Sequence, residues 1–361
     1  MPRPHLLARA AASAVALLLA VSAAPARAAD AYPGLREGDF TIADFALKNG
    51  EHLADARFHY TVLGTPMRDA AGAIVNAVML LHGTTGSGKN FLSASLAGEL
   101  FGPGQPLDAE RYFIILPDTL GHGGSSKPSD GLKGKFPHYG YLDAVEGEYR
   151  LATEGLGLKH LRLVGGTSMG GMQTWIWGEA HPQFMDALLP VAAQPVPIAG
   201  RNMLWRQAIV EAIRHDPDWH DGNYAKEPAS FVRTVPIFNI MTNNAAVLQQ
   251  AAPSRAKAVA LYDQWVADYA KSLDANDYLY WFESSYDYDP SADLEKIQAR
   301  LVAVNFADDL LNPAELGTME AAMKRVKTGR YVLVPASAQT RGHQSLTLAA
   351  LWKQPLVDLL K

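Results

Sequence analysis

The residues best placed to do chemistry lie in the pentapeptide Gly166-Thr167-Ser168-Met169-Gly170. It follows the apolar run Leu161–Gly165 and leads into a helical pattern over Gly170–Ala180. In a G-x-S-x-G turn between a strand and a helix, the serine hydroxyl is exposed at a strained backbone position. The helix N-terminus beneath it favours developing negative charge. A glycine-rich turn without chemistry is the plainer alternative, but the flanking patterns favour Ser168 as a nucleophile.

A serine hydroxyl needs a base to take its proton, and the base needs an acid that orients it. Asp308 and Asp309 follow the strand-like run Leu301–Asn305, and His343 follows the next run, Tyr331–Pro335. This gives the order Ser, Asp, His that a nucleophile of this kind requires. Both loops also end strands, where α/β sheets place their chemistry. We therefore predict His343 as the base and favour Asp308 over Asp309 as the acid.

An acyl-transfer intermediate carries an oxyanion, which two backbone N–H groups should hold. One is predicted to come from Met169, the residue after the nucleophile. The other should come from the loop after the third strand-like run, which reads Leu81-His-Gly-Thr-Thr-Gly86. We assign it to Thr84, because the glycines around it let the backbone turn an amide inward.

The same loop also fits a phosphate-binding pattern, since Gly83 to Lys89 matches G-x-x-x-x-G-K. The next residue is Asn90 instead of the Ser or Thr that holds Mg²⁺, so nucleotide hydrolysis is the weaker interpretation.

Asp118 and His122 lie in a different loop, a Gly/Ser/Pro-rich stretch after the fourth strand-like run, and are interpreted as shaping it. No histidine spacing is typical of a metal site, so neither a metal nor a cofactor is predicted.

The N-terminus has the pattern of a secretory signal peptide. Arg3 and Arg9 precede an apolar stretch over residues 10–24, and Ala26-Arg27-Ala28 is an A-x-A cleavage site. The apolar stretch is shorter than the ~20 residues of a membrane-spanning helix, so cleavage after Ala28 is favoured over an uncleaved anchor. We therefore expect a periplasmic or secreted protein, with no membrane attachment after cleavage.

Composition limits the partners of the mature chain. Removing residues 1–28 removes three arginines and no acidic residue, which changes the formal charge from −5 to −8. An acidic surface without a Lys/Arg-rich run argues against nucleic acid or an anionic membrane as a partner. The partner expected from the nucleophile is a small-molecule acyl substrate. The chain contains no cysteine, which excludes disulfides and thiol chemistry. Whether the protein is a monomer or a homodimer is left open.

Eight apolar or β-branched runs predict eight strands. They are Phe40–Leu47, Ala56–Leu63, Ala77–His82, Tyr112–Pro117, Leu161–Gly165, Ala187–Ala192, Leu301–Asn305 and Tyr331–Pro335. Several are continuously apolar, as in parallel strands buried on both faces. Helical patterns over Tyr141–Gly155, Gly170–Ala180 and Pro313–Val326 alternate with the later runs. The prediction is an α/β fold with an eight-stranded, mostly parallel sheet flanked by helices and a leading hairpin.

Residues 195–290 interrupt this alternation. They contain many tryptophans and tyrosines and helix-like stretches, but no convincing strand. We interpret them as a helical insertion that packs on the sheet and also serves as a lid over the site. The predicted organisation is a signal peptide over residues 1–28, a core formed by residues 29–194 and 291–361, and a helical lid over residues 195–290.

Five motifs together resemble homoserine O-acetyltransferase-like proteins of the α/β-hydrolase fold, over about residues 38–361. They are Phe101-Gly-Pro-Gly-Gln-Pro-Leu-Asp, the loop from Pro117-Asp118, Gly166-Thr-Ser-Met-Gly-Gly-Met-Gln, Asp274-Ala-Asn-Asp-Tyr and Ala307-Asp-Asp-Leu-Leu-Asn-Pro. The resemblance implies an α/β-hydrolase core with a helical lid and the triad Ser168, Asp308 and His343. It also implies transfer of an acetyl group from acetyl-CoA to homoserine.

Two departures from the acetyltransferases concern the acyl donor and acceptor. Gly121-His-Gly-Gly-Ser-Ser-Lys-Pro replaces a stretch ending in Gly-Ser-Thr-Gly-Pro, and Gln344 follows His343 where the acetyltransferases have Asp. Acetyl-CoA is also not expected outside the cytoplasm. The favoured function is therefore hydrolysis of an ester or similar acyl substrate by an exported serine hydrolase. Acyl transfer is the alternative, and a non-catalytic binding protein is a remote one.

Overall fold

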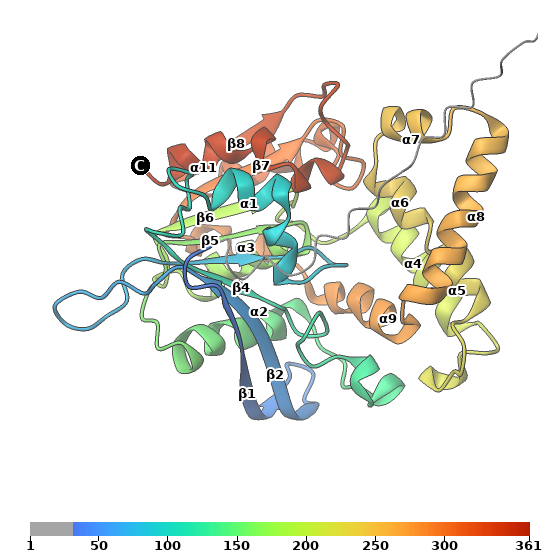
Figure 1. Cartoon of the computed structure of the whole chain (residues 1–361), viewed down its shortest axis with the longest axis horizontal. Coiled ribbons are helices and arrows are strands. Elements are labelled where there is room, and N and C mark those ends of the chain that lie inside the picture. The colour runs from blue at the N-terminus through green and yellow to red at the C-terminus, as the bar shows by residue number, and fades with distance from the viewer. Residues whose placement is uncertain (1–31) are drawn as a thin grey trace, which may run out of the picture.

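The computed structural model describes residues 32–361, so the predicted signal peptide lies outside the described residues. Eight strands form one sheet in the order β1-β2-β4-β3-β5-β6-β7-β8. The pairs β1·β2 and β2·β4 are antiparallel, and all the others are parallel. The predicted α/β architecture with a leading hairpin is therefore confirmed (Figure 1).

All eight predicted runs form strands. Their bounds are β1 Arg36–Ala46, β2 His52–Leu63, β3 Ala77–Leu81, β4 Phe113–Pro117, β5 Leu163–Thr167, β6 Ala187–Val191, β7 Arg300–Phe306 and β8 Gly329–Val334. Every residue of β3 to β6 is buried. This is the burial that continuous apolar runs predict for central parallel strands.

Helices cover both faces of the sheet. On one face, α1 (Ala94–Leu100) and α11 (Lys353–Leu359) share an apolar cluster with the strands. On the other face, α2 (Tyr141–Arg150), α3 (Met169–Ala180) and α10 (Thr318–Met323) share a second cluster. The two faces of the sheet are thus covered by different helices. The carboxyl ends of the parallel strands are where an α/β fold places its functional site.

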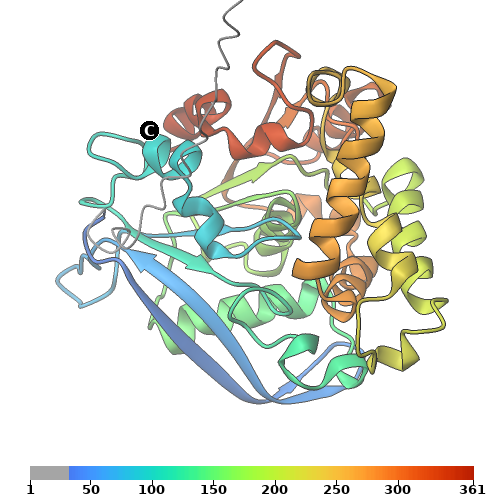
Figure 2. The same ribbon diagram turned by 45° about the vertical axis from the view of Figure 1, so that its right-hand side comes forward.

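Six helices and no strand occupy the segment between β6 and η6, a 3₁₀ turn at Ser284–Asp287. The helices are α4 Gly200–Arg214, α5 Ala229–Thr234, α6 Ile237–Thr242, α7 Ala245–Ala251, α8 Arg255–Ser272 and α9 Ala275–Glu283. They stand together at one end of the sheet, with the long helix α8 on the outside (Figures 1 and 2). Their apolar residues form a third cluster with β1 and β2, so the leading hairpin anchors this helical segment.

One helical prediction needs correction. The pattern over Pro313–Val326 predicts one helix, but the structure has a 3₁₀ turn at Ala314–Leu316 and then α10. Gly317 separates them with a φ of +63°, in the left-handed region where glycine carries no penalty. Among residues 32–361, no helix is long and apolar enough to cross a membrane.

Candidate active site

Ser168 occupies the turn between β5 and α3 with a φ of 54° and a ψ of −115°. A non-glycine residue at positive φ is strained, and such strain is typical of a nucleophile turn. The turn needs glycine on both sides. A Cβ on Gly166 would lie 2.2 Å from the carbonyl oxygen of Gly170, and a Cβ on Gly170 would lie 2.0 Å from that of Leu81.

The structure brings Ser168 and His343 together, as predicted. His343 Nε2 lies 2.8 Å from Ser168 Oγ, and its Nδ1 lies 2.7 Å from Oδ2 of Asp309. The imidazole is 5% exposed and the carboxylate 0%. If Asp309 accepts the Nδ1 proton, the neutral imidazole presents a bare Nε2 to the serine hydroxyl, as a general base must.

The prediction of Asp308 as the acid is wrong, because Asp309 carries that contact. The Oδ2 atom of Asp308 instead accepts hydrogen bonds from Asn244 Nδ2, Thr340 Oγ1 and the Gly342 N–H, at 2.7, 2.8 and 3.2 Å. The chain turns after β7, with the Asp309 N–H bonded to the Phe306 carbonyl, so the two neighbouring carboxylates point to different partners.

The surroundings of Asp309 keep it ionised. Burial opposes the charge, but the interaction with His343 and hydrogen bonds from His343, Asn312 and Leu311 lower the pKa of Asp309 overall. Its Oδ1 accepts the Leu311 N–H at 2.8 Å, and its Oδ2 accepts Nδ2 of Asn312 at 2.9 Å. A carboxylate held by several donors is preorganised to stabilise a charged imidazole.

The loop after β3 runs beside the nucleophile. A Cβ built on Gly83 would lie 3.4 Å from Cβ of Ser168, and Thr84 follows it along the cavity wall. Met169 is the first residue of α3, where a backbone N–H has no partner within the helix. This placement is compatible with the predicted pair of oxyanion donors, Thr84 and Met169, which stays a prediction.

A chain of buried hydrogen bonds connects the loop after β3 to neighbouring elements. His82 Nδ1 lies 2.8 Å from the Gly83 carbonyl, and its Nε2 accepts the Thr119 N–H at 3.1 Å. The Thr119 hydroxyl donates to Glu148 at 2.7 Å and accepts from Gln173 at 3.0 Å. Burial lowers the pKa of His82 and raises the pKa of Glu148 to about 7. The loop is thus connected to the protein interior through a neutral imidazole.

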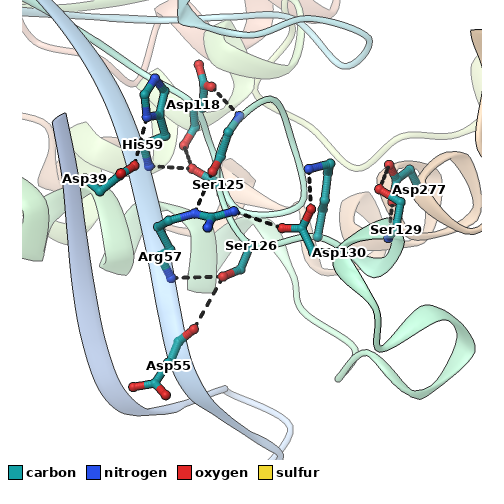
Figure 3. A network of polar contacts seen from close by, with 12 residues as sticks. Asp39, Asp55, Arg57, His59, Asp118, Ser125, Ser126, Ser129, Asp130 and Asp277 are labelled. Atoms are coloured by element: carbon teal, nitrogen blue, oxygen red, sulfur yellow. Dashed lines mark hydrogen bonds and ion pairs between the residues drawn. The ribbon is translucent and has the colours of Figure 1, made fainter. Parts of the chain in front are cut away.

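Asp118 shapes its loop, as the sequence predicts. One carboxylate oxygen accepts the Gly88 N–H and the other accepts the Gly124 N–H, each at 2.7 Å. Figure 3 shows Asp118 beside Ser125, whose hydroxyl donates to the Asp118 carbonyl at 2.6 Å. Ser129, further along the same loop, donates from its N–H and its hydroxyl to Asp277 of α9 (Figure 3). The carboxylate of Asp118 therefore joins the loop after β3 to the loop after β4.

The phosphate-binding interpretation of Gly83–Lys89 finds no support in this geometry. The Lys89 ammonium lies 2.7 Å from Glu37 on the surface, and the Gly88 N–H is already bonded to Asp118.

His122 is buried and stacks on Trp281 of α9, with ring centroids 4.8 Å apart. Burial lowers the pKa of His122 to about 3, so this imidazole is neutral and packs as an aromatic ring.

A cavity of about 450 Å³ opens onto Ser168 and His343. Residues after β3, the start of α1, the loop that carries His343 and Phe238 of α6 line it. Among the described residues, no group of three or more His, Asp or Glu side chains is arranged to hold a metal ion. The arrangement therefore offers a nucleophile, a base and an adjoining binding space.

The sequence interpretation did not single out Asn312, Glu148 or Asn244. Asp309 accepts the N–H of Leu311, two residues further on, as Asp side chains do in turns. The same signal is open to Asp308, so it neither distinguishes the two carboxylates nor identifies Asn312. Glu148 lies inside α2, and Asn244 is the N-cap of α7, a position that asparagine favours. Their partners come from distant parts of the chain.

Comparison with known proteins gives consistent results. Residues 76–237 match the family model described as alpha/beta hydrolase fold. A probable acyltransferase of Methanothermobacter thermautotrophicus is 28% identical over 284 residues, which cover 78% of this chain and 86% of that protein. A homoserine O-acetyltransferase of Gluconobacter oxydans is 26% identical over 352 residues, covering 84% of this chain and 86% of the relative.

Solved structures show the same fold. The crystal structure of esterase E22 matches with a TM-score of 0.77 at 20% identity, covering 91% of this chain and 100% of that one. At this level of identity the match speaks for the architecture alone.

Proposed function

Since the chain is an α/β-hydrolase-fold enzyme similar to the homoserine O-acetyltransferases, we propose that it hydrolyses an ester through an acyl-enzyme on Ser168. The observation that carries this proposal is the continuous contact from Ser168 Oγ through His343 to Asp309, with distances of 2.8 and 2.7 Å. These are the distances over which a serine proton is passed to a base.

The first half-reaction forms the acyl-enzyme. Ser168 Oγ bonds to the carbonyl carbon while its proton moves to Nε2 of His343, and the carbonyl oxygen becomes an oxyanion that the N–H groups of Thr84 and Met169 hold. The intermediate collapses when the carbon–oxygen bond to the alcohol breaks. His343 returns its proton to the departing oxygen, which leaves an acyl-serine and a free alcohol.

The second half-reaction repeats these steps with water. His343 takes a proton from a water molecule while the water oxygen bonds to the acyl carbon. The proton then returns to Ser168 Oγ as the carboxylic acid leaves. Asp309 remains ionised throughout and stabilises the imidazolium formed in each half. Removal of one oxyanion donor typically slows such reactions by ~10²–10³.

The helical segment over residues 195–290 acts in this proposal as the lid. Phe238 of α6 lines the cavity, and Asn244, the N-cap of α7, bonds to Asp308 and to the Thr340 carbonyl at 2.7 and 2.8 Å. Trp281 of α9 donates to the Gly121 carbonyl at 2.6 Å. These contacts connect the helices to the loops that carry the site, so the lid would shape the substrate space.

Export belongs to the proposal as well. The signal-like pattern over residues 1–28 supports it, and water is the natural acyl acceptor where acetyl-CoA is absent. Cleavage after Ala28 gives a mature protein that begins at Ala29. Intact-mass measurement of the protein purified from the periplasm and medium of a producing cell tests this, and a full-length mass in the cytoplasm would contradict export.

Turnover of 4-nitrophenyl acetate by the wild type and by Ser168→Ala tests the enzyme proposal. We expect loss of turnover in the variant and a mass increase of one acetyl group on Ser168 in the trapped wild type. Equal rates for the two proteins would contradict the proposal and favour a non-catalytic binding protein.

Acyl transfer is the second candidate, and the acyltransferase relatives favour it. The acyl-serine would then pass to an alcohol such as the homoserine hydroxyl instead of water. Incubation with acetyl-CoA and homoserine distinguishes the two functions by product. O-acetylhomoserine as the main product would establish the transferase, and acetate with free CoA the hydrolase.

A further inference from the structure

The cavity at Ser168 has an uncharged wall. Its apolar part is formed by Phe91, Leu96, Phe238 and Leu346. Its polar part consists of backbone groups, Ser and Thr hydroxyls and the amides of Asn90 and Gln344. Among the described residues, none of those that line this cavity is Asp, Glu, Lys or Arg.

The two histidines on the wall do not supply a fixed charge. His82 is 1% exposed, burial lowers its pKa, and its Nε2 is occupied as an acceptor of the Thr119 N–H. His343 is the base and is committed to Ser168 and Asp309. A charged substrate group would therefore find no opposite charge on the wall other than the catalytic groups themselves.

Two cations, Lys89 and Arg206, do not line this cavity. Lys89 follows the loop after β3, but its ammonium lies 2.7 Å from Glu37. Arg206 of α4 is 2% exposed, and its Nε donates to Asn202 at 3.0 Å. Its guanidinium lies over the Trp205 ring at 5.0 Å, while its Nη1 is buried without a hydrogen-bond partner. It is not part of the cavity wall.

The second large cavity provides a contrast. It has a volume of about 590 Å³, and its wall contains Arg201 and Glu315, but neither Ser168 nor His343. Asn312 lines the second cavity and donates to Asp309. Charged side chains thus line the second cavity, which lacks Ser168, and do not line the first cavity, which contains it.

We propose that the Ser168 site takes uncharged esters, in which both the acyl group and the alcohol lack a formal charge. This proposal rests on the proposed ester hydrolysis and narrows its substrate class. A charged group that enters such a space without a partner loses hydration and gains nothing in return. Homoserine, which carries an ammonium and a carboxylate, and the phosphates of CoA are poor fits to such a wall.

Pairs of esters with the same shape and different charge test the proposal. On the acyl side, 4-nitrophenyl 4-methylpentanoate is compared with 4-nitrophenyl succinate, in which a carboxylate replaces the branched end. On the alcohol side, 3,3-dimethylbutyl acetate is compared with acetylcholine. We expect kcat/KM to be at least roughly 100-fold higher for the neutral member of each pair.

The outcomes separate this proposal from the function on which it rests. Equal or faster turnover of the charged members would overturn the charge selectivity and leave ester hydrolysis intact. Absence of Ser168-dependent turnover with all four esters would overturn ester hydrolysis, and the substrate class with it.

A charge placed on the wall gives a second, internal test. Ser95 lies on α1, is exposed and lines the cavity, while its neighbour Ala94 is exposed and does not line it. Ser95→Lys should raise the succinate-to-methylpentanoate ratio of kcat/KM by about 3- to 5-fold, as for a partly solvated ion pair. Ala94→Lys adds the same charge and should leave the ratio unchanged. The same ratio in both variants would contradict the proposal.

Discussion

The side-chain amide of Asn312 donates a hydrogen bond to Asp309 Oδ2, the oxygen that lies 2.7 Å from His343 Nδ1. The same Nδ2 group lies 3.0 Å from the Ala192 carbonyl, and Asn312 is 3% exposed. The amide therefore connects the end of β6 to the carboxylate that contacts His343. The other carboxylate oxygen, Oδ1, accepts the Leu311 N–H.

Asn312 is thus a positioning residue for Asp309, and Asn312→Leu tests this role. The variant keeps a similar shape but removes the amide donor to Asp309 Oδ2 and to the Ala192 carbonyl, so that His343 Nδ1 remains as the partner of Asp309 Oδ2. We expect kcat to fall by roughly 10- to 100-fold, the scale of losing a partner that orients a catalytic group, with a smaller change in KM.

The pH profile separates positioning from a merely structural role. The hydrogen bond from Asn312 is one of the interactions that lower the pKa of Asp309, so its loss lets the carboxylate take up a proton at higher pH. The acid limb of kcat/KM should then move to higher pH in Asn312→Leu. A loss of activity with an unmoved acid limb and a lower unfolding temperature would indicate a structural role alone.

Neutralisation of the two neighbouring carboxylates should have very different effects. Asp309→Asn removes the charge that stabilises the imidazolium and favours the wrong tautomer of His343, so we expect kcat to fall by roughly 10³- to 10⁴-fold. Asp308→Asn only weakens contacts with Asn244, Thr340 and Gly342, and we expect less than about a 10-fold change. Steady-state hydrolysis of 4-nitrophenyl acetate measures both. A larger loss in Asp308→Asn would restore Asp308 as the triad acid.

The same pair of residues shows what the sequence could and could not predict. Strand order located the loop after β7 correctly, because continuous apolar runs and the order Ser, Asp, His depend on local pattern and topology. The choice between adjacent carboxylates depends on one turn of the backbone. That turn is set by hydrogen bonds that Asp309 accepts from the N–H groups of Leu311 and Asn312. Asp308 accepts a hydrogen bond from Asn244, which lies 64 residues away.

Buried partners from distant segments were the other difficulty. Glu148 in α2 looks like a surface residue of an amphipathic helix, yet it is fully buried and meets Thr119 and Trp177. No periodic pattern marks such a contact, because both partners come from elements 29 residues away in each direction. Conversely, all eight strands were predictable, since each is a short apolar run bounded by turn residues.

Glu148 should make the stability of the protein depend on pH. Burial raises its pKa to about 7 in the folded protein, against an ordinary value of about 4.3. The folded state therefore binds the Glu148 proton more tightly than the unfolded state does. This binding adds to the free energy of unfolding in full below about pH 4.3, and the addition is lost as the pH rises to about 7. The expected loss between these limits is on the order of 3 kcal/mol.

Glu148→Gln mimics the protonated side chain and should remove this contribution to the pH dependence. The difference in unfolding free energy between the variant and the wild type should then increase in favour of the variant from pH 5 to pH 7.5. Glu227 and Asp277 also have raised pKa values of about 7, but they titrate in both proteins and cancel in the difference. Glu146→Gln, on the same helix and partly exposed, is the control and should show a flat difference. A flat difference for Glu148→Gln would contradict the prediction.

Two glycines in helices should respond to alanine in opposite ways. A Cβ on Gly170 would lie 2.0 Å from the Leu81 carbonyl oxygen, a backbone atom that cannot move without shifting the loop after β3. We expect Gly170→Ala to destabilise the protein by roughly 3 kcal/mol and to reduce activity, because Ser168 moves with the turn. Gly98 is exposed in α1, and a Cβ added there would have no neighbouring atom within 4 Å. At this position alanine should stabilise by about 0.5–1 kcal/mol through helix propensity and leave kcat unchanged. Urea unfolding midpoints measure the stability of both variants, and 4-nitrophenyl acetate turnover measures their activity. Unchanged stability and activity in Gly170→Ala would contradict the prediction.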